Sequence, residues 1–197
     1  FMLTDSGAKA LVFGSRYSEL VKSIAHELTS VEHLIVLEDP VEEFLFYDDL
    51  ITDAAEDERF PADDDEDVTI IMFTAGTTGS PKGVMLSHDS FSSYILSNVS
   101  PPEIESEEKN ILTVPLYHIA GIQAVMAAIY GGRTLIIQRQ FEPVEWMTLV
   151  QEEKANRAMM VPTMLKMLMD HQDFENFDLS SLEVITYGAA PMPLEVI

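Results

Sequence analysis

The sequence contains no cysteine, and this absence removes several classes of site. Disulfide frameworks, thiolate metal sites and a cysteine nucleophile all need a thiol, so none of them is available to this chain. Basic residues are scarce as well, because 11 Lys and Arg stand against 34 Asp and Glu, which leaves a formal net charge of −23. Non-specific binding to nucleic acid requires a basic surface, so we expect no nucleic-acid partner.

A long uninterrupted hydrophobic run is also missing. The most weakly charged stretch is residues 111–138, in which His118 and Arg133 are the only acidic or basic residues. It is broken by turn-forming residues at Pro115, Gly121, Gly131 and Gly132, and is therefore too interrupted to span a bilayer. The N-terminal residues have neither a basic segment nor a continuous apolar core, so we expect no secretory signal and no transmembrane segment.

The negative charge is concentrated in residues 38–67. This segment holds 15 of the 34 acidic residues and a single base, Arg59. A run of like charges repels itself and stays solvated, so we interpret its densest part, residues 63–67, as a surface loop. A divalent metal site is the alternative interpretation, although this spacing lacks the glycine and the distant glutamate that calcium loops use.

Apolar segments of strand length alternate with segments of helical spacing along the rest of the chain. This alternation predicts an α/β fold around a largely parallel sheet. A length of 197 residues is enough for one or two domains. We expect strands at 10–14, 34–37, 68–74, 84–86, 111–116, 134–138, 158–161 and 184–187, and helices at 17–28, 44–55, 88–98, 119–130, 144–154 and 162–170.

A glycine-rich loop follows the strand expected at 68–74. Its glycines let the backbone approach a ligand closely, and its hydroxyls and single lysine add donors and one positive charge. A strand that leads into such a loop is where open α/β sheets bind phosphate. A Walker A loop is disfavoured, because Pro81 and Gly83 replace the glycine and the hydroxyl residue of that pattern. The polar and glycine residues of the loop are Thr74, Gly76, Thr77, Thr78, Gly79, Ser80, Lys82 and Gly83.

The exact string of this loop, TAGTTGSPKGV at 74–84, resembles the phosphate-binding signature of adenylate-forming enzymes. Three further segments resemble motifs of the acyl-CoA synthetase branch, in the family order: VPLYHIAG at 114–121, MVPT at 160–163 and ITYGAAPMP at 185–193. One departure is Ala75, which stands where the family usually has serine or threonine. We therefore identify the chain as similar to the AMP-binding domain of acyl-CoA synthetases.

The resemblance implies a role for individual residues. Lys82 is the only residue that it places in the chemistry itself, as a phosphate ligand, and the Thr74 hydroxyl would help to position Mg²⁺. His118, Gly121, Thr163 and Gly188 would form the wall of the substrate pocket. The residues implied in binding ATP are Thr74, Gly76, Thr77, Thr78, Gly79, Lys82, Gly188, Ala189 and Ala190.

The activity that the resemblance implies has two steps. A carboxylic acid, expected to be a fatty acid, reacts with ATP to give an acyl-adenylate and pyrophosphate, and coenzyme A then displaces AMP. Two other functions stay open, which are an adenylate former that acts on an aryl acid or loads a carrier protein, and a non-catalytic α/β binding module.

The family pattern also predicts that the chain is a central part of a larger protein. Its expected portions are a first α/β part at 1–55, the acidic loop at 56–67 and the phosphate-loop and pocket part at 68–197. The family's C-terminal lysine domain would lie outside it, so the chain alone is expected to be inactive. The full-length protein is expected in the cytoplasm, with peripheral membrane association as the alternative, and its oligomeric state is open.

Overall fold

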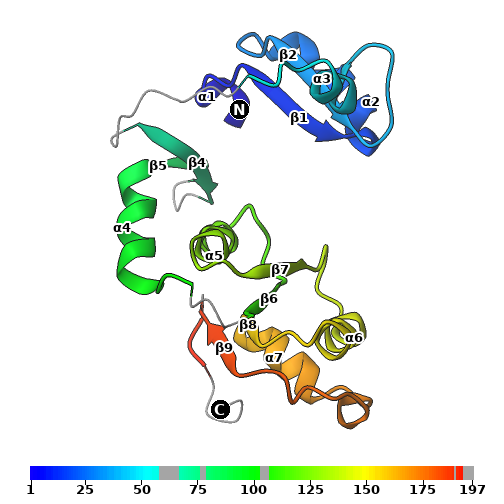
Figure 1. Ribbon diagram of the computed structural model, residues 1–197. Helices are drawn as coiled ribbons and strands as arrows, with labels where there is room; N and C mark the ends of the chain where they lie inside the picture. The colour runs from blue at the N-terminus through cyan, green and yellow to red at the C-terminus, as the bar shows by residue number, and fades with distance from the viewer. Residues whose placement is uncertain (58–66, 76–78, 103–106, 189, 193–197) are drawn as a thin grey trace. The chain divides into compact units, whose positions relative to one another are not determined.

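The computed structural model describes residues 1–57, 67–75, 79–102, 107–188 and 190–192. The chain forms two compact units, Phe1–Leu86 and Ser87–Ile197, and each is described by itself (Figure 1). The part predicted at 68–197 is therefore shared between the two units. Most of the acidic loop predicted at 56–67, namely residues 58–66, lies outside the described residues.

A three-stranded parallel sheet forms the centre of the first unit. Its order is β1 (Ala10–Gly14), β2 (His33–Leu37) and β3 (Leu45–Phe46). The core lies between this sheet and α2 (Ser18–Ile24), where Phe13, Val21 and Val36 are buried. Phe44 extends this core by an edge-to-face contact with Phe13, with ring centroids 5.0 Å apart.

Two helices expected in the first unit differ from the prediction. The segment 17–28 is divided into η1 (Ser15–Tyr17), α2 and η2 (Ala25–Glu27) instead of one continuous helix. The segment 44–55 begins as strand β3, and only α3 (Tyr47–Thr52) is helical. Here pairing with β2 overrides the weak helical periodicity, because the sheet satisfies backbone groups that a short helix would leave free. A short helix, α1 (Met2–Asp5), precedes β1.

The last part of the first unit is a two-stranded sheet of β4 (Val68–Thr74) and β5 (Lys82–Ser87). Strand β5 begins two residues before the predicted start at 84. The close approach of the two strands depends on Gly83, because a Cβ there would lie 2.8 Å from Cγ2 of Ile71. The glycine-rich loop joins these two strands, as the sequence predicts.

The second unit is built on a four-stranded sheet in which every pairing is parallel. The strand order is β7 (Thr134–Ile137), β6 (Lys109–Leu112), β8 (Arg157–Met160) and β9 (Val184–Tyr187). Strand β6 is shorter than the predicted 111–116, because the chain leaves the sheet at Thr113. The parallel α/β prediction is confirmed.

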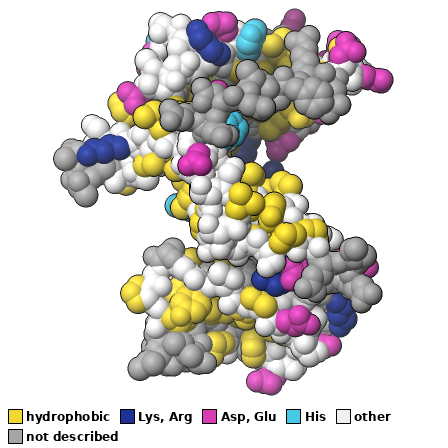
Figure 2. All heavy atoms as spheres, turned by 60° about the vertical axis from the view of Figure 1, so that its left-hand side comes forward, with side chains coloured by type: hydrophobic (Ala, Val, Ile, Leu, Met, Phe, Trp, Pro, Cys, Tyr) yellow, Lys and Arg dark blue, Asp and Glu magenta, His cyan; other side chains and the backbone are white. Residues whose placement is uncertain are grey.

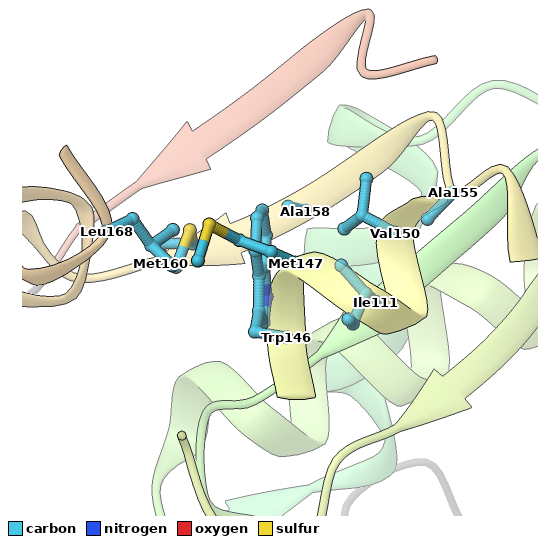
Figure 3. Packing of buried hydrophobic residues seen from close by; sticks show 8 residues of the cluster. All are labelled: Ile111, Trp146, Met147, Val150, Ala155, Ala158, Met160 and Leu168. Carbon is cyan, nitrogen blue, oxygen red and sulfur yellow. The ribbon is translucent and has the colours of Figure 1, made fainter. Parts of the chain in front are cut away.

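Helices cover both faces of this sheet. On one face α6 (Pro143–Glu153) and α7 (Pro162–Met169) pack on Ile111 and Met160, with Trp146 and Met147 almost completely buried (Figure 3). On the other face α5 (Ile119–Tyr130) packs on Leu112. The remaining helices of the unit are α4 (His88–Asn98), which contacts α5, and η3 (Phe174–Asn176).

The starts of three helices of the second unit show ordinary capping features. The Ser87 hydroxyl accepts a hydrogen bond from the Ser90 amide at 3.2 Å, which satisfies one free donor of α4. The Glu142 carboxylate does the same for the Glu145 amide at 2.6 Å, at the start of α6. Pro162 occupies the first turn of α7, where a missing N–H is tolerated.

The surface combines acidic and hydrophobic side chains, as Figure 2 shows for one face. Ile129 and Leu96, for example, are 69% and 65% exposed. A search of the described residues finds no helix of the length and hydrophobicity needed to cross a membrane.

Candidate functional site

The strand order of the second unit defines where a ligand can bind. The chain passes from β6 to β7 at one edge and then returns to β8 on the other side of β6. Ligands of open α/β sheets bind at the carboxyl ends of the strands where the order reverses, which is here between β6 and β8. The Thr113 hydroxyl, 5% exposed, follows β6 and donates to Sδ of Met164 at 3.9 Å, which links this edge to α7.

His118 lies at this edge, at the N-cap of α5. Its backbone N–H donates to the Pro115 carbonyl at 3.1 Å, and its own carbonyl accepts from the Gly121 amide at 3.0 Å. The exposed imidazole lies against the Tyr117 ring, with centroids 4.7 Å apart. Because the ring is exposed, His118 is not a core histidine, and it is free to contact a ligand that enters over α5.

The two glycines predicted for the pocket have different surroundings. A Cβ at Gly121 would lie 2.4 Å from the Pro115 carbonyl oxygen, so the protein itself requires a glycine there. A Cβ at Gly188 would meet no described atom within 4 Å. Packing therefore explains why position 121 requires a glycine. At position 188 the described residues give no steric reason for a glycine, and they leave space beside it.

A cavity of about 200 Å³ begins beside these motifs and follows α5 along the sheet. Its helical wall consists of residues from Ala120 to Ala127, which span about 10 Å at 1.5 Å per residue. Its floor is formed by strand side chains on the α5 face, and α4 contributes the opposite wall. The lining residues are Tyr94, Asn98, Val99, Asn110, Ala120, Gln123, Ala124, Ala127, Arg133, Arg157, Ala158, Met159 and Thr186.

A cluster of three charged residues lies at the far end of this cavity, where the strands begin. Nη1 of Arg157 donates to Oε1 of Glu108 at 2.7 Å, and Nε of Arg133 donates to Oε2 of the same carboxylate. Burial alone would raise the pKa of Glu108, but the hydrogen bonds and charges of both guanidinium groups outweigh it and lower that pKa. Glu108 is therefore ionised at neutral pH.

The glycine-rich loop lies in the first unit, and the structure describes part of it. Thr74 and Lys82 are both exposed, and the Thr74 hydroxyl is 3.5 Å from the Lys82 carbonyl oxygen. No ion pair involves the Lys82 ammonium among the described residues. Gly79 has a φ of +92°, a conformation that favours glycine. Gly76, Thr77 and Thr78 lie outside the described residues.

Thr163 lies away from the cavity along α5. Its exposed side chain lines a separate hollow of about 500 Å³ on α7, together with Pro143 and Lys166. The structure thus does not bring Thr163 together with the other pocket residues. Ala190 is exposed, and Ala189 lies outside the described residues.

The comparison with known families decides the identity. A model of the family described as AMP-binding enzyme matches residues 1–197. The chain belongs to this family of AMP-binding enzymes. The resemblance seen in the four motifs is therefore confirmed.

The curated relatives of this chain include CoA ligases that are much longer. The feruloyl-CoA synthase of an Amycolatopsis species is 30% identical over 197 residues, which cover 98% of this chain and 37% of the relative. The long-chain-fatty-acid–CoA ligase FadD13 of Mycobacterium tuberculosis is 29% identical over 199 residues, which cover 98% and 38%. The chain thus spans well under half the length of the relatives it matches.

A solved structure agrees with this relationship. The inhibitor-bound N-terminal domain of FACL13 from Mycobacterium tuberculosis matches all of this chain with a TM-score of 0.86 and 28% identity. The match covers 48% of that domain. The α/β fold of this chain is therefore that of part of the FACL13 N-terminal domain.

The described residues provide little for a metal ion. They contain no group of three or more His, Asp or Glu that could hold one. Mg²⁺ in nucleotide sites is held by one or two carboxylates together with phosphate oxygens and water. Thr74 could add a hydroxyl to such a set, so its proposed contact with Mg²⁺ stays a prediction.

Several residues that line the cavity were not predicted as site residues from the sequence. Asn110 and Arg157 are polar, and the predicted strands began one residue later, at 111 and 158. Thr186 lies inside a predicted strand. Because side chains alternate along a strand, Thr186 could have been assigned to the face opposite Ile185 and Tyr187. Gln123 lies one helical turn from Ala120, so the 3.6-residue period that gave the helix could also have assigned it to this face.

Proposed function

We propose that this chain provides the phosphate loop and acyl pocket of an ATP-dependent acid–thiol ligase. In the proposed reaction a carboxylic acid attacks the α-phosphate of ATP, which gives an acyl-adenylate and pyrophosphate. The thiol of CoA then takes the acyl group and releases AMP. The observation that carries the proposal is the exposed ammonium of Lys82, without an ion-pair partner among the described residues, on a glycine loop of a chain with net charge −23.

The electrostatics of the first step fit this loop. Attack of a carboxylate on a phosphate brings two anions together, so catalysis depends on positioning and on charge stabilisation. Lys82 would neutralise the β- and γ-phosphates as pyrophosphate departs, and the loop amides beside Gly79 would donate hydrogen bonds to them. Mg²⁺, when bound, would supply further positive charge to the same phosphates.

The acyl group belongs, in this proposal, to the cavity along α5. Its mouth, in this proposal, is the end at Ala120, the lining residue nearest in sequence to Gly121 and the exposed His118, and the reacting carboxylate would be held there. The cavity of about 200 Å³ is smaller than the usual 300–1,000 Å³ of ligand sites. This volume favours a compact acid, such as an aryl or short-chain acid, over a long fatty acyl chain, which was the predicted substrate.

The relatives supply both substrate types and do not decide between them. One is named a feruloyl-CoA synthase and another a long-chain-fatty-acid–CoA ligase, at nearly equal identity. Because the chain covers only 37% to 38% of these relatives, we propose that the activity belongs to a protein of their full length. The chain alone is expected to bind ATP weakly and to form no adenylate.

The test is carboxylate-dependent exchange of pyrophosphate into ATP by the full-length ligase. Lys82→Ala is expected to raise KM for ATP and to lower the exchange rate at least tenfold. Lys9→Ala removes another exposed lysine of the first unit, which pairs with Glu32, and is expected to leave exchange unchanged. Unchanged exchange in Lys82→Ala would refute the phosphate role, and exchange by the chain alone would refute its expected inactivity.

The nature of the acyl acceptor needs a separate measurement. Product formed on CoA supports the ligase, whereas product formed only on a phosphopantetheine protein supports the carrier-loading alternative. Failure to form an adenylate with any acid would favour the non-catalytic binding module.

A further inference from the structure

The inner end of the α5 cavity is polar. Near the mouth the lining is small and apolar, with Ala120, Ala124 and Met159. At the inner end it contains the guanidinium groups of Arg133 and Arg157 together with the side-chain amide of Asn110. A cavity that received only an alkyl chain would have apolar walls throughout, because polar groups buried against methylenes lose hydrogen bonds to water.

The charges at this end do not cancel. Two guanidinium groups share the single carboxylate of Glu108, so the cluster carries one surplus positive charge. The side chains are largely removed from solvent, with 13% of Arg133 and 28% of Arg157 exposed. Each guanidinium has five N–H donors, and among the described residues each directs a single hydrogen bond to Glu108. Donors thus remain for an anionic oxygen in the cavity.

Two side-chain amides extend this donor set. Asn110 on β6, 9% exposed, and Gln123 on α5 both line the cavity. Among the described residues no hydrogen bond uses either side-chain amide. The ion cluster links the amino ends of three strands. This structural role does not account for the two amides without hydrogen bonds in the described part of the chain or for the surplus charge. A ligand oxygen at the inner end would accept from the Asn110 amide and would balance the surplus charge.

We propose that the acid bound here carries a second oxygen acceptor at its far end, in its strongest form a second carboxylate. This proposal rests on the proposed ligase function and names its substrate class. The reacting carboxylate would lie beside His118, and the distal oxygen would accept hydrogen bonds from Arg157 and Asn110 at the strand starts, about 10 Å further along α5. The surplus positive charge selects an anionic or strongly accepting group over a methyl end.

The experiment compares two acids of equal length in the full-length ligase, octanedioic and octanoic acid. The wild type is expected to prefer the diacid in kcat/KM by roughly tenfold to a hundredfold, the effect of one or two hydrogen bonds to a charged group. Asn110→Leu leaves the Glu108 cluster intact and is expected to reduce this preference at least fivefold. Arg157→Met is expected to abolish it, and KM for ATP stays unchanged in both variants.

The controls separate this proposal from the function on which it rests. Asn176→Leu makes the same exchange at an exposed position of η3 and is expected to keep the wild-type preference. Activity on octanoic acid with no preference for the diacid would overturn the substrate class and leave the ligase function standing. A preference that is unchanged in Asn110→Leu and in a folded Arg157→Met would also overturn it. No adenylate with either acid or with an aryl acid would overturn both proposals.

Discussion

Gly121 lies against the backbone of Pro115, so closely that a Cβ on Gly121 would be 2.4 Å from the Pro115 carbonyl oxygen. This contact brings the first turn of α5 onto the segment that leaves β6. The same carbonyl accepts the His118 amide at 3.1 Å, so the position of the histidine depends on the contact. The glycine of the VPLYHIAG motif therefore shapes the site through packing.

We expect Gly121→Ala to destabilise the second unit by about 1 to 3 kcal/mol, because the added methyl group meets backbone that cannot move freely. Urea unfolding of the chain, followed by fluorescence of Trp146, measures this change. Trp146 is the only tryptophan and is 1% exposed, so its emission reports on this core. A midpoint equal to that of the wild type would show that the segment moves to accommodate the methyl group.

Gly188→Ala is the matched variant and is expected to behave in the opposite way. No described atom lies within 4 Å of the added Cβ, so the urea midpoint is expected to stay within about 0.5 kcal/mol of the wild type. Pyrophosphate exchange by the full-length ligase is expected to fall, because the methyl group occupies space that we assign to the ligand. Loss of stability together with unchanged exchange would instead assign Gly188 a structural role.

The sequence predicts most elements of the second unit, and the reason is visible in α5 and β9. Both have a clear apolar pattern, and both are found at the predicted residues, 119–130 and 184–187. In the first unit the weaker pattern at 44–55 failed, since a two-residue strand, β3, forms through pairing with residues distant in sequence. Local periodicity carries no information about such pairing.

The sequence prediction included residues next to the proposed mouth of the site and did not include those of its inner end. Recognisable motifs identified His118 and Gly121, and the chain places both at the switch point. The inner end depends on Asn110 and Arg157, which are polar residues inside short strands. A strand prediction based on hydrophobicity stops before such residues, although a polar side chain that faces a cavity is what a binding site requires.

The core between α6 and the sheet gives a prediction about stability. Met147 is completely buried, whereas Met169 is 49% exposed. Met147→Ala is expected to lower the free energy of unfolding by about 2 to 5 kcal/mol, since it removes buried atoms and leaves a cavity. Met169→Ala is expected to cost less than about 1 kcal/mol. Equal urea midpoints for the two variants would contradict the packing shown in Figure 3.

Asp178 makes the stability of the second unit depend on acid pH. The Ser180 hydroxyl and amide donate to its carboxylate at 2.6 and 3.1 Å, and the Lys154 ammonium lies 3.3 Å away. These contacts, the Ser180 hydroxyl foremost, lower the pKa of Asp178 from 3.8 to about 2 in the folded chain. The pKa of Asp178 is lower in the folded chain than in the unfolded chain, so the ionised carboxylate stabilises the folded state. This stabilisation is complete above pH 3.8 and is lost as the pH falls towards 2.

Asp178→Asn tests this dependence, since the amide cannot lose a charge over that range. The wild type is expected to be more stable than the variant near pH 6, and the difference is expected to shrink between pH 4 and about pH 2. Urea midpoints measured with Trp146 at several pH values give the difference directly. Glu152→Gln, at an exposed position of α6, is the control and should show no such convergence. A difference between wild type and Asp178→Asn that stays constant down to pH 2 would mean that Asp178 acts through its hydrogen bonds alone, because only the loss of its charge makes the two curves meet.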